Sequence, residues 1–173
     1  MVKKTGRIIG TTGSRRLSLA TGILALPALV ASATPGRAAS QVPDPWQVTQ
    51  EIQPEDLAKV LASPAGERPV VLYVGFQARY RNSPIVGARP TGPASEPDGA
   101  QGLRRALQGL PRDRKVVLFF GCCPWADCPN IRTAFRIAQD AGFQQVQVLV
   151  LPKSFPQDWT DKGYPVQTGE AGQ

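Results

Sequence analysis

The chain has 173 residues, of which 20 are basic and 13 acidic, with three cysteines and no histidine. The missing histidine excludes the commonest general base and any metal site built on histidine ligands. Six of the 20 basic residues and none of the acidic ones fall in residues 1–39, so the remainder has 14 basic and 13 acidic side chains, a net charge of +1. A charge so close to zero excludes the basic surface that nucleic-acid binding needs, and we expect no nucleic-acid partner.

Residues 1–39 have the pattern of an export signal. A basic start precedes the apolar run 17–30, and small residues follow that offer cleavage after Ala33 or after Ala38 or Ala39. The run is too short for a membrane-spanning helix, which needs about 20 apolar residues. The pair Arg15 and Arg16 resembles the twin-arginine pattern. We therefore predict a signal peptide of twin-arginine type, contact with a membrane only during export, and a periplasmic or secreted mature protein.

The first part of the mature chain alternates a helix and a strand. Residues 40–50 are rich in proline and polar side chains, which predicts a flexible segment leading into a domain over 51–167. Pro54 and two acids precede apolar residues at helical spacing, which predicts a short helix. The continuous run 70–74 predicts a strand covered on both faces. Residues 75–100, with four prolines and four glycines, predict a long loop, and such loops are usually functional or mobile.

The second part continues the alternation. A helix is predicted from Leu103 to Leu110, followed by a buried strand over 116–120. A further helix begins near Pro129 and ends at Gly142, and the last strand covers 146–151. Residues 168–173 are expected to form a disordered tail. Strands that alternate with helices predict an α/β fold, with a parallel sheet and helices on both faces.

The three cysteines lie within seven residues, at 122, 123 and 128, between the strand 116–120 and the helix that follows. In a parallel sheet this is the carboxyl edge, where sites form, and the start of a helix favours the reactive thiolate. Cys122, Cys123 and Cys128 are therefore the candidate catalytic residues. Cys122 is slightly favoured as the nucleophile because it lies closer to the end of the strand. A nucleophilic thiolate can hold a persulfide and pass its outer sulfur to an acceptor.

Two other uses of the cysteines stay open. An oxidising compartment favours a disulfide, either Cys123 with Cys128 or Cys122 with Cys128, which is redox-active or only a structural staple. Binding of Cu(I) or Zn²⁺ by thiolates is less favoured because no histidine or methionine lies nearby. We predict no metal and no cofactor.

The neighbours of the cysteines are candidates for substrate binding: Pro124, Trp125, Asn130 and Arg132. Arg132 suits an anionic substrate, whereas Trp125 is equally suited to packing over the loop, and Asn130 to bracing it. Asp127 or Cys128 before Pro129 is typical of a helix cap with proline at the first position. In the long loop 75–100, Arg79, Arg81 and Arg89 either add positive potential near the site or form a solvated surface.

Six segments, in this order, resemble the rhodanese-like (sulfurtransferase) domain from about Ile52 to Val166. They are Ile52–Leu57, Val70–Val74, Ile85–Ala88, Val116–Phe120, Ala141–Val146, and Trp159 with Lys162–Val166. The sequence departs from the family pattern at the cysteine position, which Phe120 takes, and at an Asp and an Arg, which Tyr73 and Gly75 replace.

The resemblance implies a three-layer rhodanese-like fold, with the cysteine loop Gly121–Asn130 at the family's active-site position. It implies sulfur or thiol handling through a persulfide or a disulfide, of the thiosulfate or persulfide sulfurtransferase or the thiol–disulfide type. The partner is then a small sulfur-containing anion or a protein thiol. The alternative is a catalytically inactive rhodanese-like binding module, whose disulfide is structural and which binds a partner through residues 75–100.

Overall fold

The computed structural model describes residues 43–64, 68–81, 85–121 and 123–167. The predicted signal peptide at 1–39 and the predicted tail at 168–173 lie outside these residues, and so does Cys122. Within the described parts, no helix has the length and apolar character that crossing a membrane requires.

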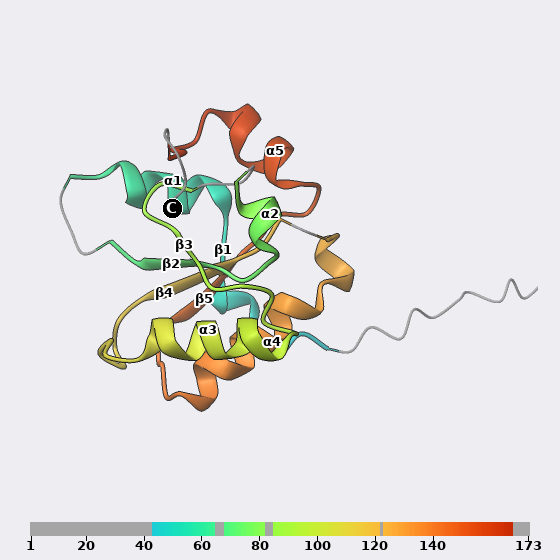
Figure 1. The fold of residues 1–173 in the computed structure, drawn as a ribbon. Coiled ribbons are helices and arrows are strands. Elements are labelled where there is room, and N and C mark those ends of the chain that lie inside the picture. The colour runs from blue at the N-terminus through green and yellow to red at the C-terminus, as the bar shows by residue number, and fades with distance from the viewer. Residues whose placement is uncertain (1–42, 65–67, 82–84, 122, 168–173) are drawn as a thin grey trace, which may run out of the picture. The chain divides into compact units, whose positions relative to one another are not determined.

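Five short strands and five α-helices form the described domain (Figure 1). The strands are β1 (Glu51–Ile52), β2 (Val70–Tyr73), β3 (Arg89–Pro90), β4 (Val116–Phe119) and β5 (Val146–Leu149). The helices are α1 (Pro54–Ala62), α2 (Gln77–Tyr80), α3 (Pro97–Leu107), α4 (Pro129–Asp140) and α5 (Phe155–Asp158). The 3₁₀ helices, each of a single turn, are η1 (Val48–Gln50), η2 (Trp125–Asp127) and η3 (Thr160–Lys162).

All strands are parallel, and their order in the sheet is β1-β5-β4-β2-β3. The central strand β4 pairs with β2 on one side, where Val116 is opposite Val70, and with β5 on the other, where Val116 is opposite Val146. Because parallel strands need crossover connections, each link runs through a helix on one face of the sheet. The carboxyl ends of β2, β4 and β5 therefore share one edge.

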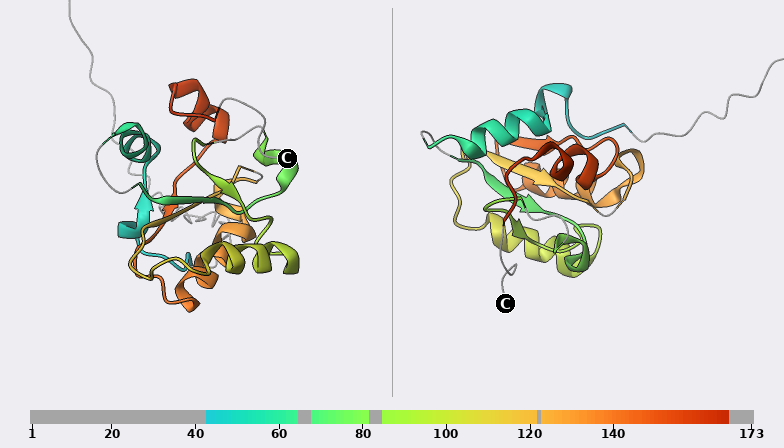
Figure 2. Two further views of the ribbon diagram at one scale, coloured as in Figure 1. Left: turned by 60° about the vertical axis from the view of Figure 1, so that its left-hand side comes forward. Right: turned by 90° about the horizontal axis from the view of Figure 1, so that it is seen from above.

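The alternation of side chains along β4 explains the two layers of helices. Val116, Leu118 and Phe120 face α3 and α4, while Val117 and Phe119 face the opposite layer. That opposite layer consists of α1, α2 and α5, which cover the other face of the sheet (Figures 1 and 2). All four residues of β4 are fully buried, so its continuous apolar run is that of a strand covered on both sides.

The predicted α/β fold with a parallel sheet and helices on both faces is confirmed. The helix predicted from Pro54 is α1, and the one predicted from Pro129 is α4; both begin with proline at the first position. In α4 the apolar residues Ile131, Ala134, Phe135 and Ala138 are all buried, as their helical spacing requires.

Two predictions about the middle of the chain are wrong. The helix predicted from Leu103 to Leu110 begins six residues earlier, at Pro97, and ends at Leu107. The predicted long loop 75–100 contains α2, β3 and the first turn of α3. The early start of α3 depends on two glycines that have no side chain to clash. A Cβ on Gly99 would lie 2.1 Å from the carbonyl oxygen of Pro93, and one on Gly102 would lie 2.2 Å from that of Thr91.

The segment predicted to be flexible, 40–50, is anchored in its described part. Trp46 is 7% exposed and belongs to the core on the α4 side, and its indole Nε1 donates to Glu51 Oε1 at 3.1 Å. We call residues 43–47 the N-terminal strap. A large aromatic ring buried between other rings gives this segment a fixed place that its proline-rich composition does not predict.

Candidate functional site

The cysteine loop follows β4 directly and ends at the start of α4. Phe120 continues the buried strand, Gly121 follows it, and Cys128 is the N-cap residue of α4. Cys123 and Cys128 form a disulfide, with their Cα atoms 5.5 Å apart. Of the two pairings that the sequence left open, the structure has this one.

The two bonded sulfur-bearing residues lie in different surroundings. Cys128 is fully buried, within the core between the sheet and α4. Cys123 is only half-buried and lines a cavity of about 320 Å³. Cys123 is among the described residues that line this cavity, and Cys128 is not. The bond is therefore asymmetric in access as well as in environment.

The cavity lies at the carboxyl edge of the sheet, between the cysteine loop and the segment after β5. Its described lining residues are Arg79, Phe120, Gly121, Cys123, Pro124, Leu151, Lys153, Ser154, Phe155 and Pro156. Two of these are basic, and none of the described ones is acidic. A carboxylate next to the cavity, on Asp158, accepts hydrogen bonds from the backbone N–H groups of Lys153 (2.8 Å) and Ser154 (2.9 Å). The cavity thus combines a disulfide, an apolar wall and two cations.

Arg132 supports the cysteine loop through hydrogen bonds to backbone carbonyl groups. Its Nη1 donates to the carbonyl oxygen of Cys128 at 3.0 Å and to that of Trp125 at 3.4 Å. Its Nη2 lies 2.6 Å from Asp44 Oδ1, and the guanidinium is 5.7 Å from the ring centroid of Trp46. With its side chain 16% exposed, Arg132 connects the loop to the N-terminal strap. These contacts support the loop, and they give a role to a residue that the sequence predicts as substrate-binding.

Trp125 lies between aromatic rings. It stacks on Phe120 at a centroid distance of 5.8 Å and meets Trp46 edge-on at 6.0 Å. Of the two uses considered for Trp125, packing over the loop is the one that these contacts describe. Pro124, its neighbour in sequence, is exposed and lines the cavity, where a substrate would meet it.

Asn130 is 2% exposed, and its Oδ1 accepts from the backbone N–H of Ser95 at 3.0 Å and from Ser95 Oγ at 2.6 Å. These bonds tie the start of α4 to the segment before α3. The same segment is fixed to β2, since Thr91 donates its N–H and its hydroxyl to the carbonyl oxygen of Tyr73. Asn130 therefore connects the start of α4 to the segment before α3 at the carboxyl edge of the sheet.

Tyr73 and Gly75, two of the residues at which the sequence departs from the pattern it resembles, pack against each other. Tyr73 is fully buried against Phe119 and Tyr80, with ring centroids 5.1 and 5.2 Å apart. A Cβ on Gly75 would lie 2.7 Å from Tyr73 Oη. Tyr80, beside Arg79 on α2, donates its hydroxyl to the carbonyl oxygen of Ala88 at 2.6 Å, and burial raises the pKa of this phenol. An aromatic cluster thus occupies the end of β2.

Sequence reasoning found the loop and missed part of the cavity. Arg79 was one of three candidate arginines; it lines this cavity, whereas Arg89 lines another surface hollow and Arg81 is exposed. Lys153 was not predicted. Its position just after the last strand is the available signal, because all strand ends share this edge.

Within the described residues no group of three His, Cys, Asp or Glu side chains could hold a metal ion.

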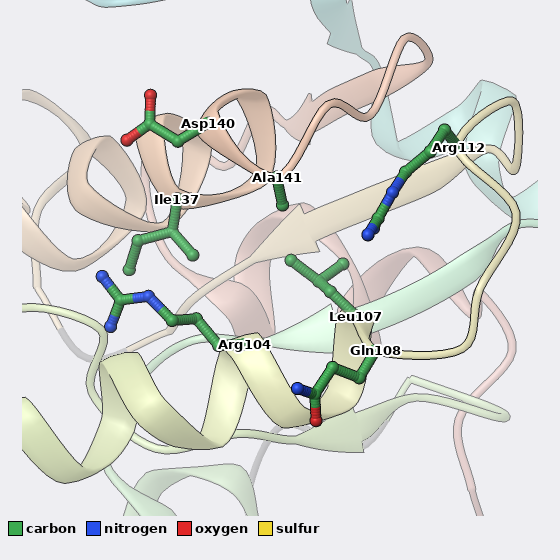
Figure 3. A pocket seen from close by; sticks show the side chains of 7 residues that line it. All are labelled: Arg104, Leu107, Gln108, Arg112, Ile137, Asp140 and Ala141. Atoms are coloured by element: carbon green, nitrogen blue, oxygen red, sulfur yellow. The ribbon is translucent and has the colours of Figure 1, made fainter.

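A second cavity, of about 280 Å³, lies between α3 and α4 near the start of β4. Figure 3 shows Arg104 and Leu107 on α3 with Gln108 at its C-cap, and Ile137 and Asp140 on α4 with Ala141 at its C-cap. Arg112 completes the lining and places its guanidinium 4.8 Å from the ring centroid of Phe143. This hollow has both signs of charge and no cysteine among its described residues, so the cavity beside the disulfide is the candidate site.

Three solved structures of the Alr3790 protein from Anabaena sp. resemble this chain. A crystal structure of the protein matches with a TM-score of 0.49 and 20% identity over 67% of this chain and 90% of that one. A solution NMR structure of its rhodanese-like domain gives 0.48 and 21% over 72% and 86%, and an X-ray structure of that domain gives 0.45 and 21% over 64% and 98%. No protein-family model and no curated protein matches the sequence.

The sheet topology shows an α/β fold with a parallel sheet. The segments that carry the sequence resemblance lie at its structural junctions. The closing Trp159 is fully buried and donates its indole Nε1 to the carbonyl oxygen of Pro165 at 3.1 Å. Ile85 forms an antiparallel bridge with Val166, which connects the middle of the chain to its end.

Proposed function

We propose that this protein is an exported rhodanese-like protein that exchanges thiols and disulfides through Cys123–Cys128. The observation that carries the proposal is the asymmetric disulfide, with Cys123 on the cavity wall and Cys128 sealed at the N-cap of α4. Export, predicted from residues 1–39, would place the protein in the periplasm or outside the cell, where disulfides persist.

The geometry favours attack at one sulfur. An incoming thiolate would reach Cys123 Sγ from the cavity, form a new S–S bond with it, and release Cys128 Sγ as a thiolate. The leaving sulfur lies at the N-cap of a 12-residue helix, where unpaired N–H groups and the helix dipole favour an anion.

A second thiol completes the cycle. It attacks the mixed disulfide on Cys123, leaves as the oxidised disulfide RSSR, and releases the Cys123 thiolate. Two thiols are oxidised, and the protein disulfide is reduced to two cysteines. The reverse reaction reoxidises the protein. In the reduced state, the Cys123 thiolate could instead attack the outer sulfur of thiosulfate, which forms a persulfide on Cys123 and releases sulfite, the rhodanese-like use of the same position.

Reduction of insulin disulfides, with dithiothreitol as electron source, tests the proposal. The wild type should accelerate the reaction, and Cys123→Ser and Cys128→Ser should each fall to the rate of dithiothreitol alone, because either change removes the bond. Arg105→Gln, an exposed position on α3, is the control and should keep the wild-type rate.

A Cys123–Cys128 bond that dithiothreitol reduces only after the protein unfolds would contradict the proposal. That outcome would support the inactive binding module with a structural disulfide. Loss of sulfur transfer in Cys122→Ser alone would assign the chemistry to Cys122 and to the persulfide route.

A further inference from the structure

The charge of the cavity beside Cys123 identifies a class of partner. Arg79 reaches the cavity from α2, which follows β2, and Lys153 reaches it from the segment after β5. Because β2 and β5 flank β4, the two cations come from opposite sides of β4. Asp158 accepts hydrogen bonds from the backbone N–H groups of Lys153 and Ser154, but it is not among the described residues that line the cavity. Among the described lining residues no acid offsets the two cations, so the field in the cavity favours an anion.

The size and walls of the cavity point to a small molecule. Its volume of about 320 Å³ is at the lower end of the range for small-ligand pockets, roughly 300–1,000 Å³. Phe120, Leu151 and Phe155 form apolar walls, which suit a short carbon skeleton. Cys123 lines the same cavity, so its half of the disulfide lies next to whatever the cavity holds.

We propose that the thiol partner of the Cys123–Cys128 disulfide is a small anionic thiol, one that carries a carboxylate or an equivalent negative group. This inference rests on the proposed exchange function. The anionic group would lie toward Arg79 and Lys153, and the thiolate would attack Cys123 Sγ. The new bond joins the small thiol to Cys123, the Cys123–Cys128 bond breaks, and its electron pair leaves on Cys128 Sγ. A second anionic thiol then releases the oxidised small disulfide and the Cys123 thiolate.

Three small thiols that differ in charge test this inference on the whole protein. They are 3-mercaptopropionate, 2-mercaptoethanol and cysteamine, which carry negative, neutral and positive groups beside the thiol. Each second-order rate of Cys123–Cys128 reduction is divided by the rate of the same thiol with bis(2-hydroxyethyl) disulfide, a neutral reference, so that differences in thiol pKa cancel. The normalised rates should fall in the order anionic, neutral, cationic.

The expected preference follows from Coulomb attraction. One unit charge at about 4 Å in water changes a rate by about fivefold, so the anionic thiol should be about fivefold or more faster than the neutral one. The preference should shrink in 1 M salt, where the screening length falls to about 3 Å.

Matched variants assign the effect to the cavity. Arg79→Gln and Lys153→Gln should each reduce the anionic preference by about half or more, and the double variant should remove it. Arg105→Gln makes the same change of charge on the exposed face of α3 and should leave the preference unchanged.

The possible failures are distinct. If all three thiols reduce the native bond at equal normalised rates, or if the double variant keeps the preference, the anionic-thiol inference is wrong while the exchange function stands. If none of the thiols reduces the bond in the folded protein, the proposed function itself is wrong.

Discussion

At the scale of single residues, Gly75 shows how packing determines the sequence at the end of β2. The Tyr73 ring lies over Gly75, where any side chain would meet the phenol. Tyr73 is in turn fixed between Phe119 and Tyr80. Glycine is therefore required by packing, without any special backbone conformation, and the two replacements are a matched pair.

Gly75→Ala should destabilise the protein by about 1–3 kcal/mol, the usual cost of adding a methyl group to a filled core. Urea denaturation at unchanged m-value measures the loss. In a Tyr73→Leu background the cost of Gly75→Ala should fall to within about 0.5 kcal/mol of zero, because the two sites no longer contact each other. A cost that persists in that background would mean that the ring is not the obstacle.

The site residues differ in how far the sequence could predict them. Cysteine spacing limited the pairing to two possibilities, and only the three-dimensional loop decides between Cys122 and Cys123. Asn130 is bonded to Ser95, 35 residues away, and no local pattern signals such a contact. Arg79 and Lys153 meet at the cavity only because the strand ends share one edge. Side chains that converge from distant segments are set by tertiary packing, which periodicity does not encode.

At the scale of elements, the N-terminal strap is part of the support of the cysteine loop. Trp46 contacts the rings of Trp125 and Phe135, at centroid distances of 6.0 and 5.5 Å. Asp44 pairs with Arg132, whose guanidinium holds the Cys128 carbonyl. The strap thus reaches the loop through both an apolar and a charged contact.

Trp46→Ala should cost about 3–5 kcal/mol, as expected when a buried tryptophan is truncated. Val48→Ala, two residues further along the chain, is the control. Val48 is 81% exposed, so this substitution should change the free energy of unfolding by no more than about 0.5 kcal/mol. Equilibrium unfolding of both variants measures the difference. If both substitutions lower the free energy of unfolding by small and equal amounts, the N-terminal strap is not anchored in solution.

Element prediction succeeded where the apolar pattern is long. The runs that form β2, β4 and β5 and the helical spacing in α1 and α4 were sufficient to predict these elements and the α/β class. The strands β1 and β3 have two residues each, too few to show a period of two. The start of α3 was missed because Gly99 and Gly102, which usually weaken a helix, are needed there for close contact with residues 91–93.

At the scale of the whole molecule, charge and cysteine state bear on the predicted export. Residues 1–39 carry six of the seven net positive charges, and the remaining chain is close to neutral. A mature protein in an oxidising compartment would keep the Cys123–Cys128 bond and one further cysteine, Cys122.

The intact mass of the protein from the exported fraction tests the predicted signal cleavage and the Cys123–Cys128 disulfide. The mass should correspond to a chain cut after Ala33, or after Ala38 or Ala39. Alkylation in denaturant should modify one cysteine without reduction and three after reduction, because one disulfide protects two thiols. A full-length mass in that fraction would contradict signal cleavage, and three modified cysteines without reduction would contradict the disulfide.

The early position of Trp46 has a practical consequence for anyone who shortens this chain. A version begun at Glu51, the domain border that the sequence pattern suggests, would retain every strand and helix of the sheet layers. It would nevertheless lack the indole that covers Phe135 and Trp125, and the carboxylate that neutralises Arg132. Such a truncated protein would expose an aromatic surface next to its own disulfide, and its reactivity would misrepresent that of the longer molecule.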